Sequence, residues 1–117
     1  MGGTYTLAED GMYYPDIILP KDENPRYGKY GRLRRDYLRE HRQGLYMELL
    51  MEGKLVKHLN EIDEVAHNRV ELMVRQMAER QGIDEALKTH KQMKWVQLMN
   101  NCKNAAEEIV LRELIYN

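Results

Sequence analysis

Residues 30–117 contain no proline, because the three prolines of this 117-residue chain stand at positions 15, 20 and 25. Proline removes a backbone donor and clashes with the preceding helical turn, so a long stretch without it can stay helical. Strong helix formers dominate this stretch, and its breaks are the glycines at 44, 53 and 82. The pattern predicts helices at about 31–42, 45–51, 54–82 and 84–117, the last with Asp84 as its N-cap.

Each of the two longest predicted helices carries one narrow apolar stripe, since its apolar residues recur at three- and four-residue steps. The stripe on 54–82 consists of Leu55, Leu59, Ile62, Ala66, Val70, Met73 and Met77. The stripe on 84–117 consists of Leu87, Trp95, Leu98, Met99, Cys102, Ala105, Ala106, Ile109 and Val110. These helices can pack as an antiparallel hairpin or on a second copy of the chain. Because the stripes extend beyond what one hairpin covers, a homodimer through the long helices is a hypothesis.

The first twenty residues differ from the rest, because they favour strands. Tyr5 and Leu7 alternate with threonines, and "AEDG" supplies turn residues before "MYY" and "DIILP". We therefore expect a small β-hairpin at 1–20, a loop at 21–29 and a helical part at 30–117. The length fits a single domain over 1–117, mainly α, with a helical bundle dominated by two long antiparallel helices.

Composition points to the cytoplasm. The chain has no apolar run of the roughly 18 residues that a membrane span needs, and its start lacks the basic and apolar regions of a signal peptide. Cys102 is the only cysteine, which agrees with a reducing compartment and excludes both an internal disulfide and a thiolate metal cluster within one chain. We expect no contact with membrane.

Charge is distributed unevenly along the chain, although the formal net charge is only −1. Residues 1–25 carry one lysine against five carboxylates, a net of −4. Residues 26–42 carry seven cations against Asp36 and Glu40, a net of +5. A local basic field of this kind can attract a polyanion even when the whole chain is nearly neutral.

A helix over 30–42 would divide this basic segment into two faces. Tyr30, Leu33, Tyr37 and His41 fall on a packing face, and an arginine ridge lies on the other side, within an arc of about 80°: Arg32, Arg35, Arg39 and Arg42. Guanidiniums spaced by one and two turns suit successive phosphates. Lys29, Tyr27 and Tyr30 could add charge, stacking or hydroxyl contacts. The alternative is a solvated face whose charges are balanced by Asp36 and by the acidic N-terminal segment.

Residues suited to catalysis or to metal binding are sparse. Serine is absent from the chain, so no serine nucleophile can exist, and Cys102 lies among apolar residues of a predicted helix. Glu64 and His67 have the Glu-x-x-His spacing of a di-iron half-site, but no second such pair occurs. We therefore expect no enzyme, no metal and no cofactor.

Three segments together resemble the TnpV family of proteins encoded by bacterial transposons: "MGGTYTL...DGMYYPDIILP", "YGKYGRLRRDYLREHR" and "QMKWVQLMNNCKNAAEEIVLRELIY". The resemblance extends over nearly the whole chain. Its basic segment includes Arg32, Arg35, Tyr37, Leu38, Glu40, His41 and Arg42. Its C-terminal pattern includes Trp95, Val96, Met99, Asn100, Ala106, Glu107, Glu108 and Glu113, whereas Cys102 and His67 do not belong to it.

The resemblance implies a mobile element that also encodes a recombinase, and it implies no particular activity. Together with the charge pattern it favours an accessory protein that contacts DNA through the basic helix and assists or regulates its element. The alternative is a helical interaction module whose stripes dock the recombinase or another partner.

Overall fold

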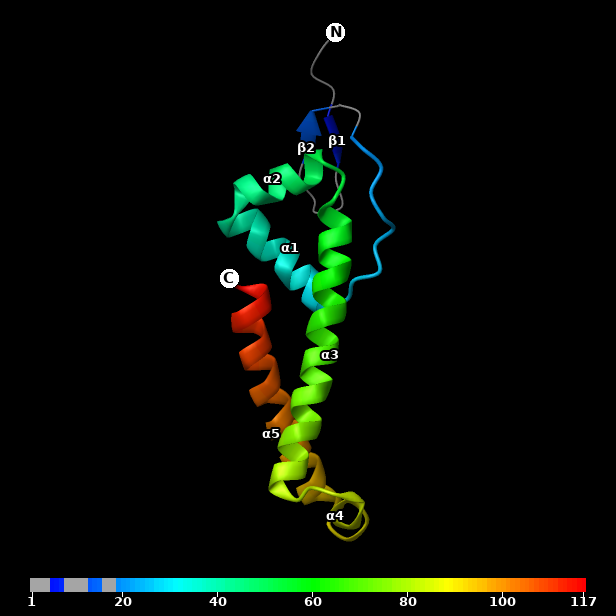
Figure 1. Ribbon diagram of the computed structural model, residues 1–117, viewed down its shortest axis with the longest axis vertical. Helices are drawn as coiled ribbons and strands as arrows, with labels where there is room; N and C mark the ends of the chain where they lie inside the picture. Colours follow the sequence, from blue (N-terminus) through cyan, green and yellow to red (C-terminus); the bar gives the residue numbers. More distant parts are fainter. Residues whose placement is uncertain (1–4, 8–12, 16–18) are drawn as a thin grey trace.

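The computed structural model describes residues 5–7, 13–15 and 19–117. In chain order they form β1 (Tyr5–Leu7), β2 (Tyr13–Pro15), α1 (Lys29–His41), α2 (Gln43–Met51), α3 (Leu55–Gln81), α4 (Glu85–His90) and α5 (Gln92–Val110). A π-helical turn, Leu111–Ile115, continues α5 (Figure 1). The mainly α fold predicted from the sequence is confirmed. None of the described helices contains a stretch long and apolar enough to cross a lipid bilayer.

The antiparallel pair of α3 and α5 forms the long axis of the molecule, which measures 71 × 22 × 20 Å (Figure 1). The predicted stripes meet in this pair, where Ala66 and Val70 of α3 are buried with Ala106 and Val110 of α5. Tyr30 of α1 and Ile115 of the π-helical turn complete this cluster. The predicted antiparallel hairpin of long helices is therefore confirmed.

The helices α1 and α2 cover one end of the pair and form a second apolar cluster. Leu38 of α1 and Tyr46 of α2 are buried there against Leu55 and Leu59, which belong to the first turns of α3. Leu38 and Leu59 are almost completely shielded from solvent, with exposed fractions of 0% and 1%. This second cluster fixes the direction in which α1 crosses α3, and so determines which side of α1 faces outward.

Two acidic residues cap helices from far away in the chain. The residue before α1 is Gly28, which has no side chain, and the carboxylate of Asp63 in α3 accepts a hydrogen bond from the Gly31 N–H at 3.0 Å instead. Asp22 caps the start of α3 in the same way, accepting from the N–H groups of Val56 at 2.7 Å and Lys57 at 3.2 Å. These contacts satisfy donors that every helix leaves open at its first turn, with a favourable negative charge.

The predicted helix boundaries agree with the structure at both ends of α3, and they differ at the breaks after α1 and after α4. Gly82 ends α3 in the left-handed conformation (φ 69°), and Asp84 accepts a hydrogen bond from the Leu87 N–H, both as predicted. Gly44, however, lies inside α2, because the break after α1 falls on Arg42 (φ −135°, ψ 54°). The burial of Tyr46 in the second cluster offsets the roughly 1 kcal/mol that glycine costs a helix.

The last predicted helix is also interrupted. It breaks at Lys91 (φ −139°, ψ 66°), which separates α4 from α5. The break lets α4 fold against α5, where the Lys88 ammonium lies 4.9 Å from the centre of the Trp95 ring. A straight helix could not make this cation–π contact, because its residues 88 and 95 stand two turns apart.

At the N-terminus, β1 and β2 pair antiparallel, with Thr6 opposite Tyr14. Of the predicted hairpin at 1–20, residues 1–4, 8–12 and 16–18 lie outside the described residues, and residues 19–20 carry no helix or strand. Residues 21–28, which are most of the loop predicted at 21–29, carry no helix or strand.

Replacing Gly31 or Gly44, which both lie in helices, by alanine is expected to change the stability of the protein in opposite directions. A Cβ on Gly31 would collide with the Tyr27 side chain, whereas a Cβ on Gly44 would meet nothing within 4 Å. Gly31→Ala should therefore lower the free energy of unfolding by about 1–3 kcal/mol through overpacking. Gly44→Ala should raise it by about 0.5–1 kcal/mol through helix propensity. Urea denaturation of both variants checks this, and equal shifts would contradict the tight approach at Gly31.

Candidate nucleic-acid interface

Of the predicted packing face of α1, Tyr30 is buried and Leu33 and Tyr37 are half-buried, whereas His41 is exposed, so that part of the prediction is wrong. Tyr30 and Leu38 are buried, with exposed fractions of 3% and 0%. Arg32 and Arg42 lie on the outer side and are exposed. Within the described part of the chain, neither of these two guanidiniums makes a hydrogen bond or an ion pair. Both are therefore available to a phosphate.

The other two ridge arginines share one carboxylate. Arg35 Nε lies 3.4 Å and Arg39 Nη2 3.2 Å from Oδ1 of Asp36, and both arginine side chains are largely covered, at 20% and 23% exposure. Burial alone would lower the pKa of Arg35, but the hydrogen bond to Tyr27 and the charge of Asp36 outweigh it, so the pKa is raised. Asp36 is itself 43% exposed, so an external anion can compete with it for both guanidiniums.

Lys29 and Tyr30 are engaged with α5. The ammonium of Lys29 and the hydroxyl of Tyr30 both donate to Oε1 of Glu107, each at 2.8 Å. These two donors hold the pKa of Glu107 below its usual value. Burial, followed by the hydrogen bond to Glu107, raises the pKa of Tyr30. The buried Tyr30 ring leaves no face on which a base could stack.

Tyr27 also faces the protein rather than solvent. It is half-buried against the second apolar cluster, and its N–H donates to Asn60 at 3.0 Å. The acidic N-terminal segment does not balance the ridge through its described carboxylates. Asp22 caps α3, and Glu23 contacts Arg26 and Asn60. The carboxylates at 9, 10 and 16 fall outside the residues whose side chains the structure describes.

Arg34 is a buried cation, and its structural role was not predicted from the sequence. Only 6% of it is exposed, and its Nη1 donates to the carbonyl oxygens of Ile115 and Asn117 at 3.0 and 3.2 Å. Its Nε donates to Nε2 of His58 at 3.4 Å, and burial followed by the charge of Arg34 lowers the pKa of that histidine. A signal was present, because residue 34 lies one turn from both Tyr30 and Leu38 on the buried side of α1.

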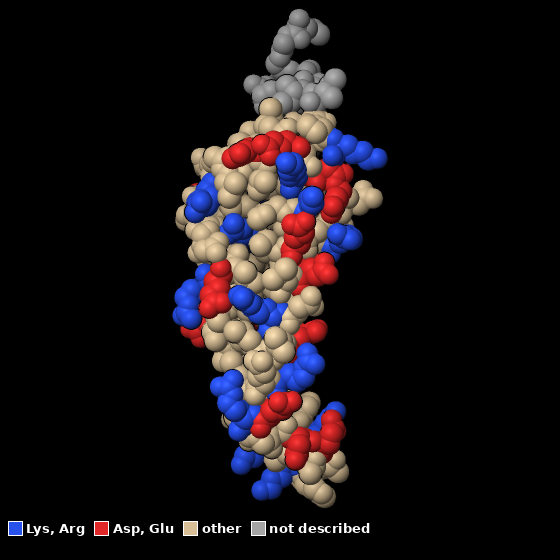
Figure 2. All heavy atoms as spheres, in the orientation of Figure 1, with Lys and Arg blue, Asp and Glu red and all other residues tan. Residues whose placement is uncertain are grey.

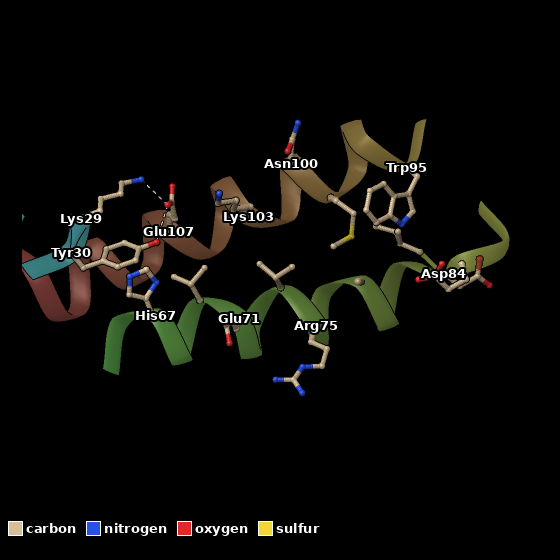
Figure 3. Close-up of a pocket in the computed structure, with 16 residues that line it drawn as sticks. Lys29, Tyr30, His67, Glu71, Arg75, Asp84, Trp95, Asn100, Lys103 and Glu107 are labelled. Carbon is tan, nitrogen blue, oxygen red and sulfur yellow. Dashed lines mark hydrogen bonds and ion pairs between the residues drawn. The ribbon is translucent and has the colours of Figure 1, made fainter. Parts of the chain in front are cut away.

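A groove of about 860 Å³ opens between α3 and α5, below α1 (Figure 3). Its walls include Val70, Val74 and Ala78 of α3 and Trp95 and Met99 of α5. Lys29, Tyr30, His67 and Glu107 close one end, and residues 83–85 close the other. Figure 3 shows the Glu71 and Arg75 side chains pointing away from α5, on the outer rim of the α3 wall.

Metal ligands do not gather in the described part of the chain, where no group of three His, Cys, Asp or Glu residues could hold an ion. His67 does not pair with Glu64 as a half-site. It lies 3.6 Å from Asp63, with its ring at 4.8 Å from that of Tyr30. On the face drawn in Figure 2, positive and negative side chains are interspersed along the molecule.

Comparison with known proteins gives one family match. The model of the family described as transposon-encoded protein TnpV matches residues 4–115. No curated protein and no solved structure matches the chain.

Proposed function

Because the chain belongs to the TnpV family of transposon-encoded proteins, we propose that it is a non-enzymatic accessory protein of its mobile element that contacts DNA through α1. The observation that carries the proposal is the outward position of Arg32 and Arg42, whose guanidiniums have no partner in the described part of the chain. The two are separated by ten residues, or about 15 Å along the helix axis. Between them stand Arg35 and Arg39, bound to the half-exposed Asp36.

This arrangement supports contact with the DNA backbone rather than with base edges. Arginine forks fit phosphate oxygens in bidentate pairs and release a counterion for each phosphate that they neutralise. The predicted aromatic contributors, Tyr27 and Tyr30, face the protein. The proposed contact is therefore largely independent of DNA sequence, with Arg32 and Arg42 binding first and Arg35 and Arg39 joining when a phosphate displaces Asp36.

Binding of a fluorescent DNA duplex, followed by anisotropy at several salt concentrations, tests the proposal. Two to four neutralised phosphates predict that affinity falls roughly 10- to 150-fold between about 50 and 200 mM salt. Replacing Arg32, Arg35, Arg39 and Arg42 together by glutamine should abolish binding while the far-UV circular dichroism stays unchanged. If this variant binds as well as the wild type, α1 is an ordinary solvated surface and the interaction-module alternative is left.

A single substitution at the centre of the ridge sharpens the test. Asp36→Asn removes the carboxylate that occupies Arg35 and Arg39, so DNA affinity at fixed salt should rise several-fold and the salt dependence should steepen. The control is Glu64→Gln, which removes one negative charge from an exposed position on α3. An equal gain in DNA affinity in both variants would mean that only the net charge matters and that Asp36 does not compete with DNA for Arg35 and Arg39.

A further inference from the structure

The groove between α3 and α5 leaves the lower half of the helix pair without a covering layer. Above it, α1 packs on the same two helices, and Tyr30 marks the point where this cover ends. Below that point, the apolar side chains of Val70, Val74, Ala78, Trp95 and Met99 line an open groove. Two helices bury a stripe against each other but need a further pair to close a bundle core.

We propose that a second copy of this chain fills the groove, with α3 packed antiparallel against α3 of the partner subunit about a two-fold axis that crosses α3 at the height of residue 73. A second helix hairpin supplies the two helices that a four-helix bundle lacks. In this arrangement the same surface of each copy makes the contacts across the interface, which is how two-fold dimers associate. Val74 and Ala78 are small enough to let the two α3 helices approach closely.

The charges on the rim of α3 single out this partner and this register. Glu71 and Arg75 are exposed, stand one turn apart on α3 and line the outer rim of the groove. About an axis at the level of residue 73, position 71 faces position 75. Glu71 therefore faces the partner's Arg75, and Arg75 faces the partner's Glu71.

These rim charges are not used within the chain. The side chains of Glu71 and Arg75 make no hydrogen bond or ion pair with any other described residue. Their places beside an apolar floor match the flanking charges that set partner choice and orientation in coiled coils. The rim is thus complementary to itself in the antiparallel direction, which an unrelated partner would not require. This inference does not depend on DNA binding by α1.

Light scattering on the purified chain, combined with charge exchange, tests the dimer. The wild type at tens of micromolar should have twice the mass of the monomer. Glu71→Arg places two arginines opposite each other across the interface, and Arg75→Glu places two glutamates there. Because like charges then face each other, each variant alone should dissociate at least tenfold more readily than the wild type. An equimolar mixture of the two variants should recover the dimer mass, because in the mixed dimer the two arginines of one copy face the two glutamates of the other.

The mixture distinguishes contacts between copies from effects within one helix. If a substitution had destabilised its own α3, mixing the two variants could not restore the dimer. The control is Arg80→Glu, which lies on the opposite side of α3 from Glu71, is exposed and should leave the mass unchanged. Circular dichroism should show equal helicity in all variants. A monomeric wild type, single variants that remain dimers, or a mixture that stays monomeric would each overturn the proposal.

Discussion

Asn60→Ala should lower the free energy of unfolding by about 2–4 kcal/mol, because this one side chain holds the segment that leads into α1. Asn60 is 4% exposed, and its Oδ1 accepts from the N–H groups of Arg26 at 2.8 Å and Tyr27 at 3.0 Å. Its Nδ2 donates to the carbonyl oxygen of Asn24 at 3.0 Å and to Glu23 at 3.2 Å. Alanine would leave several partly buried backbone groups without partners.

Urea denaturation measures this loss, and hydrogen exchange locates it. The amides of Arg26 and Tyr27 should exchange faster in the variant than those in the middle of α3. Asn68→Ala is the matched control, because Asn68 is exposed on the same helix, and its change should stay within about 0.5 kcal/mol. Equal losses at the two positions would show that Asn60 does not hold the segment.

Arg34→Leu is expected to cost about 2–4 kcal/mol, even though leucine is apolar and the site is buried. The substitution leaves the carbonyl oxygens of Ile115 and Asn117 without their donor. Arg34→Lys should recover only part of the loss, since an ammonium cannot reproduce the guanidinium fork that also reaches His58.

Arg32→Leu serves as the control, because Arg32 stands two residues away on the exposed side of α1. It should change the unfolding midpoint in urea only slightly. Amide exchange over residues 111–117 should accelerate in Arg34→Leu and not in Arg32→Leu. If the two variants unfold alike, the contacts of Arg34 with the last turn contribute nothing to stability.

Local sequence signals predicted the parts of the fold that depend on neighbouring residues. Gly82 and Asp84 ended one helix and began the next as predicted, because a left-handed glycine and an aspartate N-cap act within a few residues. The breaks at Arg42 and Lys91 have no such signal, since neither is a glycine or a proline. There the burial of Tyr46 and the contact of Lys88 with Trp95 accompany the break.

The candidate site was predictable only where it depends on helix periodicity. The 100° step correctly placed Arg32 and Arg42 outside and Tyr30 inside, but it also put His41 on the packing face, and His41 is exposed. It could not show that Glu107 holds Lys29 and Tyr30, because these partners are separated by 78 and 77 residues in the chain. The caps formed by Asp22 and Asp63 were hidden for the same reason, since each joins segments more than 30 residues apart.

The length of the α3–α5 pair has a practical consequence for measuring molecular size. A body of 71 × 22 × 20 Å is about three times as long as it is wide, so it diffuses more slowly than a sphere of equal mass. On a sizing column calibrated with globular standards, even a single chain of this protein should elute early and imitate a heavier particle. A frictional ratio from sedimentation velocity, well above that of a sphere, is the expected hydrodynamic signature of the long helices.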